Sequence, residues 1–250
     1  MERPRRTASL WLVLAGFFAL WLILDRSAAG LGSYRGELGV AVCLVVLAAA
    51  LAVEVPLSRV SAWQALTDLG LKWPDAIGMI GTTALCGAML LFYPLFAIAT
   101  GTTLRLRADW FLLLPGLFAQ GGIAEETVFR GFLFRHVRNG RSFWRAALLS
   151  SAPFIAVHLL LFFSMDWPIA LAALLVALSI SYPLAWLFER SGNSIWPCAL
   201  VHFVVQGSIK LIDVPDQQLL PMAIAWMVVS ASAPWLFFLI LRPYTTEYSP

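Results

Sequence analysis

The stretch that decides the fold class is IGMIGTTALCGAMLLFYPLFAIA, which runs from Ile77 to Ala99 without a single charged residue. As an α-helix it is long enough to cross the hydrocarbon core of a bilayer, which takes about 20 apolar residues. A buried strand or a soluble core helix is usually shorter and is soon interrupted by polar residues. The stretch therefore predicts a transmembrane helix.

Apolar runs of this kind recur along the whole chain. Hydrophobic residues make up 60% of the sequence and charged residues 12%, whereas an ordinary soluble domain is about 25% charged. We expect about eight transmembrane helices, near Ser9–Leu24, Leu38–Val53, Ile77–Ala99, Trp110–Arg130, Trp144–Phe163, Trp167–Phe188, Ile195–Ile212 and Leu219–Leu241. The sequence thus predicts an all-α polytopic membrane helix bundle, with residues 1–250 as a single integral-membrane domain. It excludes a soluble domain, a disordered chain and a nucleic-acid-binding module.

The basic residues predict how the bundle is oriented. With the N-terminus inside, the loops on that side carry Arg3, Arg5, Arg6, Arg59, Lys72, Arg135, Arg138, Arg141, Arg145, Arg190 and Arg242. The opposite loops carry only Arg26, Arg35, Arg105, Arg107 and Lys210. Because cytoplasmic loops are enriched in Arg and Lys, we expect both termini in the cytoplasm. We expect an integral protein of the bacterial inner membrane, with the first apolar run retained as a helix although it resembles a signal peptide.

Ionisable residues inside the spans are the functional candidates, because charge in a bilayer is costly. Glu125, Glu126 and Arg130 close the fourth span, and His158 and His202 lie in the fifth and seventh. One helical turn separates Glu126 from Arg130, so the two can form an ion pair and leave Glu125 as the less neutralised acid. The alternative is a purely structural role, in which both acids only neutralise the charge of Arg130 and each histidine is a packing residue. His136, among arginines, is interpreted as a solvated loop residue.

The same residues predict hydrolytic chemistry if they meet. Counted from the nearest loop, Glu125, His158 and His202 all fall in the cytoplasmic half of the bundle, so one pocket can hold them. A glutamate with a histidine can orient and deprotonate a water molecule. A second histidine with an amide side chain can stabilise an oxyanion, and Gln206 lies one turn after His202 on the same face. This set favours hydrolysis of an amide bond.

At these residues the sequence resembles the CPBP family of intramembrane endopeptidases, the CAAX protease and bacteriocin-processing (Abi) family. The family pattern is EExxxR, then FxxxH, then HxxxN. Glu125-Glu126-xxx-Arg130 matches the first motif and Phe154-xxx-His158 the second. His202-xxx-Gln206 matches the third in its histidine, but glutamine replaces the usual asparagine.

The resemblance implies a CAAX-protease-like catalytic core over residues 110–206 of an eight-helix bundle. It implies a glutamate-type endopeptidase that cleaves a membrane-anchored protein or peptide near a membrane-embedded C-terminus. By position, Glu125 is the general base with His158, Glu126 and Arg130 as supports, and His202 with Gln206 forms the oxyanion site. Glutamine is one methylene longer than asparagine, so the role of Gln206 depends on where the backbone lies.

Other functions use the same residues. Two histidines and a glutamate can bind catalytic zinc, but the sequence lacks HExxH and the ligands would come from three helices, so we expect no cofactor. A non-catalytic immunity or scaffold protein would use the charged cluster only to hold helices together. A transporter would favour broken helices, which Pro115, Gly121 and Gly122 allow, but no inverted repeat is visible. The substrate, its prenylation and the oligomeric state stay open.

Overall fold

A computed structural model describes residues 9–30, 36–164 and 166–241 of the chain. The basic residues Arg3, Arg5, Arg6, Arg35 and Arg242, which contribute to the predicted orientation, lie outside the described residues.

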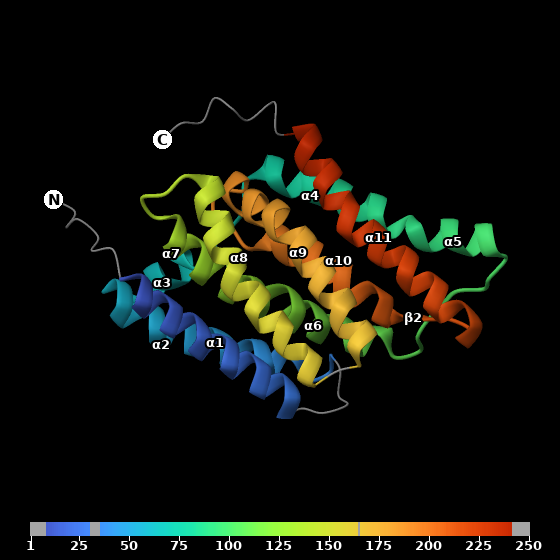
Figure 1. Ribbon diagram of the computed structural model, residues 1–250, viewed down its shortest axis with the longest axis horizontal. Coiled ribbons are helices and arrows are strands. Elements are labelled where there is room, and N and C mark those ends of the chain that lie inside the picture. The colour runs from blue at the N-terminus through green and yellow to red at the C-terminus, as the bar shows by residue number, and fades with distance from the viewer. Residues whose placement is uncertain (1–8, 31–35, 165, 242–250) are drawn as a thin grey trace.

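The described chain is almost entirely helical (Figure 1). Its α-helices are α1 (Leu10–Gly30), α2 (Gly39–Ser58), α3 (Ala62–Asp68), α4 (Ala76–Leu90), α5 (Phe92–Thr100), α6 (Trp110–Leu117), α7 (Arg135–Arg138), α8 (Phe143–Leu159), α9 (Trp167–Arg190), α10 (Trp196–Gly207) and α11 (Asp216–Leu241). Two π-helical segments, η1 (Phe118–Ala124) and η2 (Thr127–Phe134), lie between α6 and α7. Two 3₁₀ turns, η3 (Leu160–Phe163) and η4 (Ser208–Leu211), follow α8 and α10. The two short strands are β1 (Arg105–Leu106) and β2 (Ile212–Asp213).

The predicted polytopic helix bundle is confirmed. Among the described residues, 6 helical stretches are long and apolar enough to cross a membrane: Leu10–Gly30, Gly39–Ser58, Ala76–Thr100, Phe143–Phe163, Trp167–Arg190 and Asp216–Ile240. The other two expected spans are also helical but do not reach that length as regular helix. The run expected at Trp110–Arg130 changes from α- to π-helix after Leu117, and α10 ends at Gly207 before a 3₁₀ turn.

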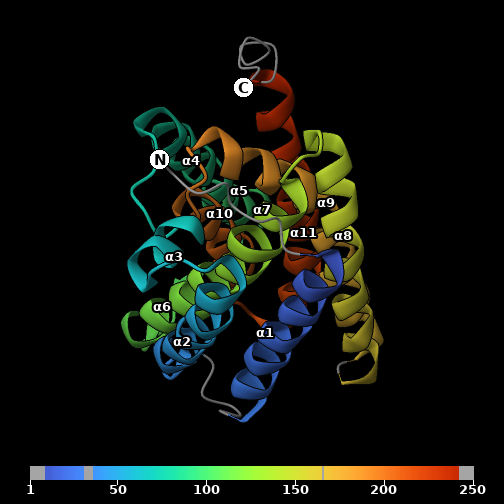
Figure 2. The same cartoon turned by 90° about the vertical axis from the view of Figure 1, so that its left-hand side faces the viewer.

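Each outer helix buries one narrow stripe and leaves apolar side chains on its other faces. In α1 the buried residues are Val13, Phe17, Leu20 and Leu24, which follow the spacing of one helix face. Trp11, on the opposite face of α1, is 81% exposed. A helix that is apolar on all sides is suited to lipid on its outer face. Figures 1 and 2 show α1 beside α2 and α8 beside α9, while α10 lies in the interior.

The loops gather at two opposite ends of the bundle. At one end, β1 pairs with β2 in antiparallel register, which joins Arg105 to Asp213. At the other end, Ser194 donates to the Lys72 carbonyl at 2.9 Å, and the Arg138 guanidinium is paired with Glu189. Segments that the basic-residue pattern assigned to one side of the membrane therefore lie at one end of the bundle.

The helix that carries Glu125 and Glu126, here called the motif helix (residues 110–138), runs through the middle of the bundle. Glycines make this possible because they let other backbones come close. A Cβ on Gly116 would lie 1.1 Å from the Gly36 carbonyl oxygen, and one on Gly131 would lie 2.2 Å from the Leu69 carbonyl oxygen. A Cβ on Gly122 would lie 2.8 Å from the carbonyl oxygen of Ala199 in α10. These glycines do not break the helix; they let it pack against its neighbours at backbone distance.

Gly116→Ala tests this packing. The added methyl group overlaps the Gly36 backbone, and a backbone cannot rotate away as a side chain does. We expect the free energy of unfolding to fall by about 3 kcal/mol or more, measured as a lower melting temperature and a lower yield of detergent-solubilised protein. Gly87→Ala in α4 is the matched control, because a Cβ there has nothing within 4 Å and alanine favours a helix by up to about 1 kcal/mol. Equal melting temperatures for the two variants would contradict the close packing.

Candidate active site

The two acids of the motif helix lie where its two π-helical segments meet. Glu125 follows η1 and Glu126 precedes η2. π-helical turns are rare and often occur at functional sites. Glu126 is completely buried, whereas the side chain of Glu125 is 21% exposed. The two neighbouring carboxylates are therefore in different environments.

The ion pair that the spacing predicts is present. Arg130 Nη1 donates to Glu126 Oε1 at 2.8 Å, and both side chains are buried. The Arg130 guanidinium also lies over the ring of Phe154, 5.2 Å from its centroid, which is cation–π geometry. The Phe154 ring in turn packs edge-on against Phe129, with centroids 4.5 Å apart. A buried charge needs this much support, because an unpaired charge at that depth would be strongly destabilising.

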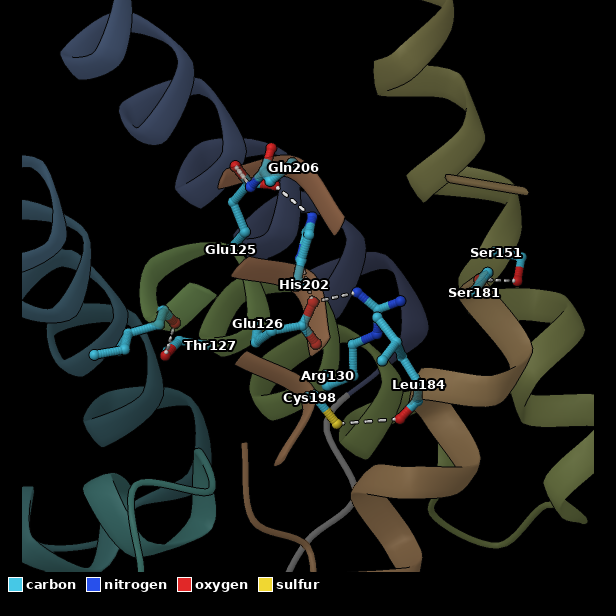
Figure 3. Close-up of polar contacts among 11 residues, drawn as sticks. Glu125, Glu126, Thr127, Arg130, Ser151, Ser181, Leu184, Cys198, His202 and Gln206 are labelled. Atoms are coloured by element: carbon cyan, nitrogen blue, oxygen red, sulfur yellow. Dashed lines mark hydrogen bonds and ion pairs between the residues drawn. The ribbon is translucent and has the colours of Figure 1, made fainter. Parts of the chain in front are cut away.

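His202 joins the two acids. Its Nδ1 lies 2.6 Å from Glu126 Oε1, and its Nε2 lies 3.5 Å from Glu125 Oε2 (Figure 3). The imidazole comes from α10, so this contact links the motif helix to α10. Two carboxylates and one guanidinium are therefore linked through a single imidazole. This link between His202 and Glu126 could not be predicted from the spacing of the residues.

Gln206 contacts Glu125 directly. Its amide Nε2 donates to Glu125 Oε1 at 3.3 Å, one helical turn after His202 on α10. Figure 3 shows Gln206, Glu125, His202, Glu126 and Arg130 following one another through the interior. Five of the six predicted site residues thus form one connected polar group. Glu125 is the member with the longest, weakest contacts and the most exposed carboxylate.

His158 does not join that group through a hydrogen bond. Its Nδ1 bonds to the Phe154 carbonyl at 2.8 Å within its own helix, and its ring packs against the Phe154 ring with centroids 4.5 Å apart. Phe154 also contacts Arg130, so a single aromatic side chain separates His158 from the charged pair. His158 therefore lies next to the site but is not hydrogen-bonded to Glu125, which the sequence had suggested as its partner.

A second buried cluster lies near the end of the motif helix, and the sequence analysis missed it. Glu54 of α2 is fully buried and accepts from Arg135 Nη2 at 2.6 Å, while His136 Nε2 lies 2.8 Å from its other oxygen. The interpretation of His136 as a solvated loop residue is wrong, because its side chain is only 10% exposed. A glutamate near the end of an apolar run was the available signal. The cluster fixes the motif helix to α2.

The C-terminal turn of α10, which carries Gln206, is held by aromatic residues of other helices. Trp226 Nε1 of α11 donates to the Val205 carbonyl at 2.8 Å. The Tyr93 hydroxyl of α5 lies 2.7 Å from Ser208 Oγ, and its ring stacks on Trp226 with centroids 5.0 Å apart. No sequence pattern marks these residues. They limit the freedom of the backbone that positions His202 and Gln206.

Metal binding was an alternative use of these side chains. Within the described residues, no group of three or more His, Cys, Asp or Glu side chains is arranged to hold a metal ion. His202 directs both ring nitrogens at carboxylates, and His158 bonds to a backbone carbonyl. Both histidines therefore have other partners in this structure, and zinc remains an alternative for experiment.

Comparison with known families agrees with the motifs. The family model described as Type II CAAX prenyl endopeptidase Rce1-like matches residues 106–208. The match confirms the resemblance to the CPBP family, and the matched range contains every candidate site residue. No curated protein and no solved structure shows a significant match to the chain. Together with the apolar helices, the family match supports a membrane endopeptidase in general.

The unequal environments of the two acids give a testable difference. Glu126→Gln removes the negative charge that faces buried Arg130 and His202, so we expect it to lower the free energy of unfolding by about 3–5 kcal/mol. Glu125→Gln changes a partly exposed carboxylate with long contacts and should stay within about 1 kcal/mol of wild type. Thermal melts of the purified variants in detergent measure both. A Glu126→Gln variant as stable as Glu125→Gln would contradict the neutralising role of Glu126.

Proposed function

We propose that this protein is an intramembrane endopeptidase that hydrolyses a peptide bond near the membrane-embedded C-terminus of a protein substrate. Glutamate- and histidine-activated water attacks the bond, without a cofactor. The observation that carries the proposal is the convergence of Glu125, His202 and Gln206, which brings a partly exposed carboxylate together with two potential donors. The family match supports the same reaction class.

Glu125 is the proposed general base. A general base must be reachable by water and must not be held by a strong ion pair. Glu125 meets both conditions, since its carboxylate is partly exposed and its contacts to Gln206 and His202 are 3.3 and 3.5 Å long. Glu126 meets neither, because it is fully buried and bonded to Arg130 and His202 at 2.8 and 2.6 Å.

His202 and Gln206 are the proposed oxyanion donors. Glu126 orients the His202 ring through Nδ1, which leaves Nε2 directed toward Glu125. To donate to an oxyanion there, the ring must carry a hydrogen on Nε2 as well as the one directed at Glu126, as an imidazolium does. The Gln206 amide lies beside the same carboxylate and can turn its N–H toward a developing negative charge. Donors held in advance at the position of that charge are an effective source of catalysis. Arg130 contributes indirectly, because its ion pair holds the Glu126 carboxylate in place.

His158 is proposed as a support for the water molecule. Its Nδ1 is bonded to the Phe154 carbonyl, and Nε2 is the ring nitrogen left for other contacts. When the ring is neutral, a hydrogen on Nδ1 makes Nε2 an acceptor. Its position beside Phe154, which also contacts Arg130, keeps the ring next to the site.

The proposed reaction needs neither a metal nor a covalent enzyme intermediate. Glu125 takes a proton from water while the water oxygen bonds to the scissile carbonyl carbon, and the carbonyl oxygen becomes an oxyanion near His202 and Gln206. The C–N bond then breaks as Glu125 returns the proton to the leaving amine. The products are a new carboxyl terminus on the membrane-anchored part and a released C-terminal peptide.

The proposed substrate is a membrane-anchored protein with a CAAX-type terminus or a C-terminal sorting helix. The proposed location is the bacterial inner membrane, with both termini cytoplasmic. The concentration of basic residues in the loops that contain Lys72, Arg138 and Arg190 supports this orientation. Arg138 pairs with Glu189 at the end of α9, and the Lys72 carbonyl accepts from Ser194 in the turn that follows, so these loops share one end of the bundle.

Cleavage of a defined peptide tests the proposal. Purified protein in liposomes is given a quenched fluorescent peptide that ends in a farnesylated CAAX sequence and, separately, a transmembrane peptide without the lipid. We expect Glu125→Gln to lower turnover by about 10²-fold or more, because it removes the base and keeps the shape. Glu189→Gln is the matched control, since Glu189 pairs with Arg138 at the end of the bundle. Equal cleavage by wild type and Glu125→Gln would exclude Glu125 as the base.

The same assay addresses the alternatives. If water is activated without a metal, we expect turnover to survive extensive chelation and the purified protein to contain far less than one equivalent of zinc. Activity that is lost on chelation and restored by zinc alone would favour a zinc protease. Two results together would favour the non-catalytic scaffold. The purified wild-type protein would cleave neither peptide, and the membrane proteins of cells would have the same C-termini whether or not Glu125 is present.

A further inference from the structure

Gly121 faces the end of the Gln206 side chain. It lies in η1, one turn before Glu125 in the motif helix, and it is buried. A Cβ built on Gly121 would lie 2.1 Å from Gln206 Nε2, 3.0 Å from Cδ and 3.5 Å from Cγ. The nearest atom is thus the amide nitrogen that donates to Glu125 Oε1 at 3.3 Å. The Gln206 amide occupies the space that a side chain at residue 121 would fill.

We propose that Gly121 is a positioning residue that provides the room in which Gln206 reaches Glu125. An asparagine at position 206 would place its amide nitrogen near the present Cδ position, about 1.3 Å back along the side chain. Such an amide would lie about 3.0 Å from a Cβ at residue 121 instead of 2.1 Å, a contact that a shift of a few tenths of an ångström relieves, but it would stand further from Glu125. The longer side chain of Gln206 therefore depends on glycine at residue 121. Gly121 acts only through Gln206.

The neighbouring glycine has a different reason for being small. A Cβ on Gly122 would meet the Ala199 carbonyl oxygen at 2.8 Å, which belongs to the α10 backbone. A backbone cannot be displaced without moving the helix, whereas a glutamine amide can swing aside. Gly121→Ala should therefore leave the fold intact and move the amide, while Gly122→Ala should strain the contact between the motif helix and α10.

A double-mutant cycle tests the proposal. Turnover of the farnesylated CAAX peptide is compared for wild type, Gly121→Ala, Gln206→Asn and the double variant. We expect Gly121→Ala alone to lower turnover by about 10²-fold, the loss typical of one displaced oxyanion donor. When Gln206→Asn is already present, adding Gly121→Ala should change turnover by no more than about twofold. This arm of the experiment rests on the proposed function.

Melting temperatures of the same four proteins test the pairing without any activity. Alanine favours the helix at either site, but only with Gln206 present does the new methyl group displace the amide. The change in melting temperature caused by Gly121→Ala should therefore be more favourable by about 2–4 °C when it is combined with Gln206→Asn. Gly122→Ala is the matched control and should cost the same in both backgrounds. Equal effects of Gly121→Ala on melting temperature in both backgrounds would overturn the proposal. If the effects differ as expected but the peptide is not cleaved, the pairing of Gly121 with Gln206 is supported and the protease function is contradicted.

Discussion

The arrangement of the site depends on one buried carboxylate. Glu126 is fully shielded from solvent, and an unpartnered charge there would destabilise the fold by several kcal/mol. Two groups contact the same oxygen of this carboxylate: Arg130 from its own helix and His202 from α10. Because both bonds are short, they set the rotation of the motif helix and the orientation of the imidazole together. Glu125, the next residue, is then directed to the side where Gln206 and the second His202 nitrogen lie. The buried acid thus determines the geometry around the exposed one.

Close backbone packing and a few polar anchors keep these parts in place. Gly116, Gly122 and Gly131 let the motif helix pass other segments at distances that a methyl group would prevent. In a membrane, where lipid tails are as apolar as the side chains, such contacts and interhelical hydrogen bonds hold helices together. Glu54 with Arg135 and His136 fixes the motif helix to α2. Tyr93, Ser208 and Trp226 fix the end of α10. The acids and the proposed oxyanion donors are therefore carried by two helices that are each fastened at a separate point.

The fold and the family match support a membrane endopeptidase. The difference in burial between Glu125 and Glu126 is consistent with that class of enzyme. A hydrolase needs a base that water can reach and a donor that is held ready for negative charge. In the proposed mechanism Glu126 holds the donor His202 in place, and Glu125 remains available as the base. The replacement of the family asparagine by Gln206 fits the same scheme, because Gly121 leaves room for the longer amide.

Much of this could be predicted from the sequence, because it depends on local patterns. Long apolar runs predict membrane helices wherever they occur, and the spacing of Glu126 and Arg130 predicts their ion pair because residues one turn apart share a helix face. The motifs in order predict the family. Contacts between distant segments could not be predicted, since they depend on how helices rotate and how deep they lie. These contacts include His202 with Glu126, Gln206 with Glu125, and buried Glu54 with His136, a residue whose arginine-rich surroundings indicated solvent. The π-helical turns and the glycine contacts are of the same kind, because only the neighbouring backbone decides whether a glycine is a break in a helix or the place where another chain segment fits.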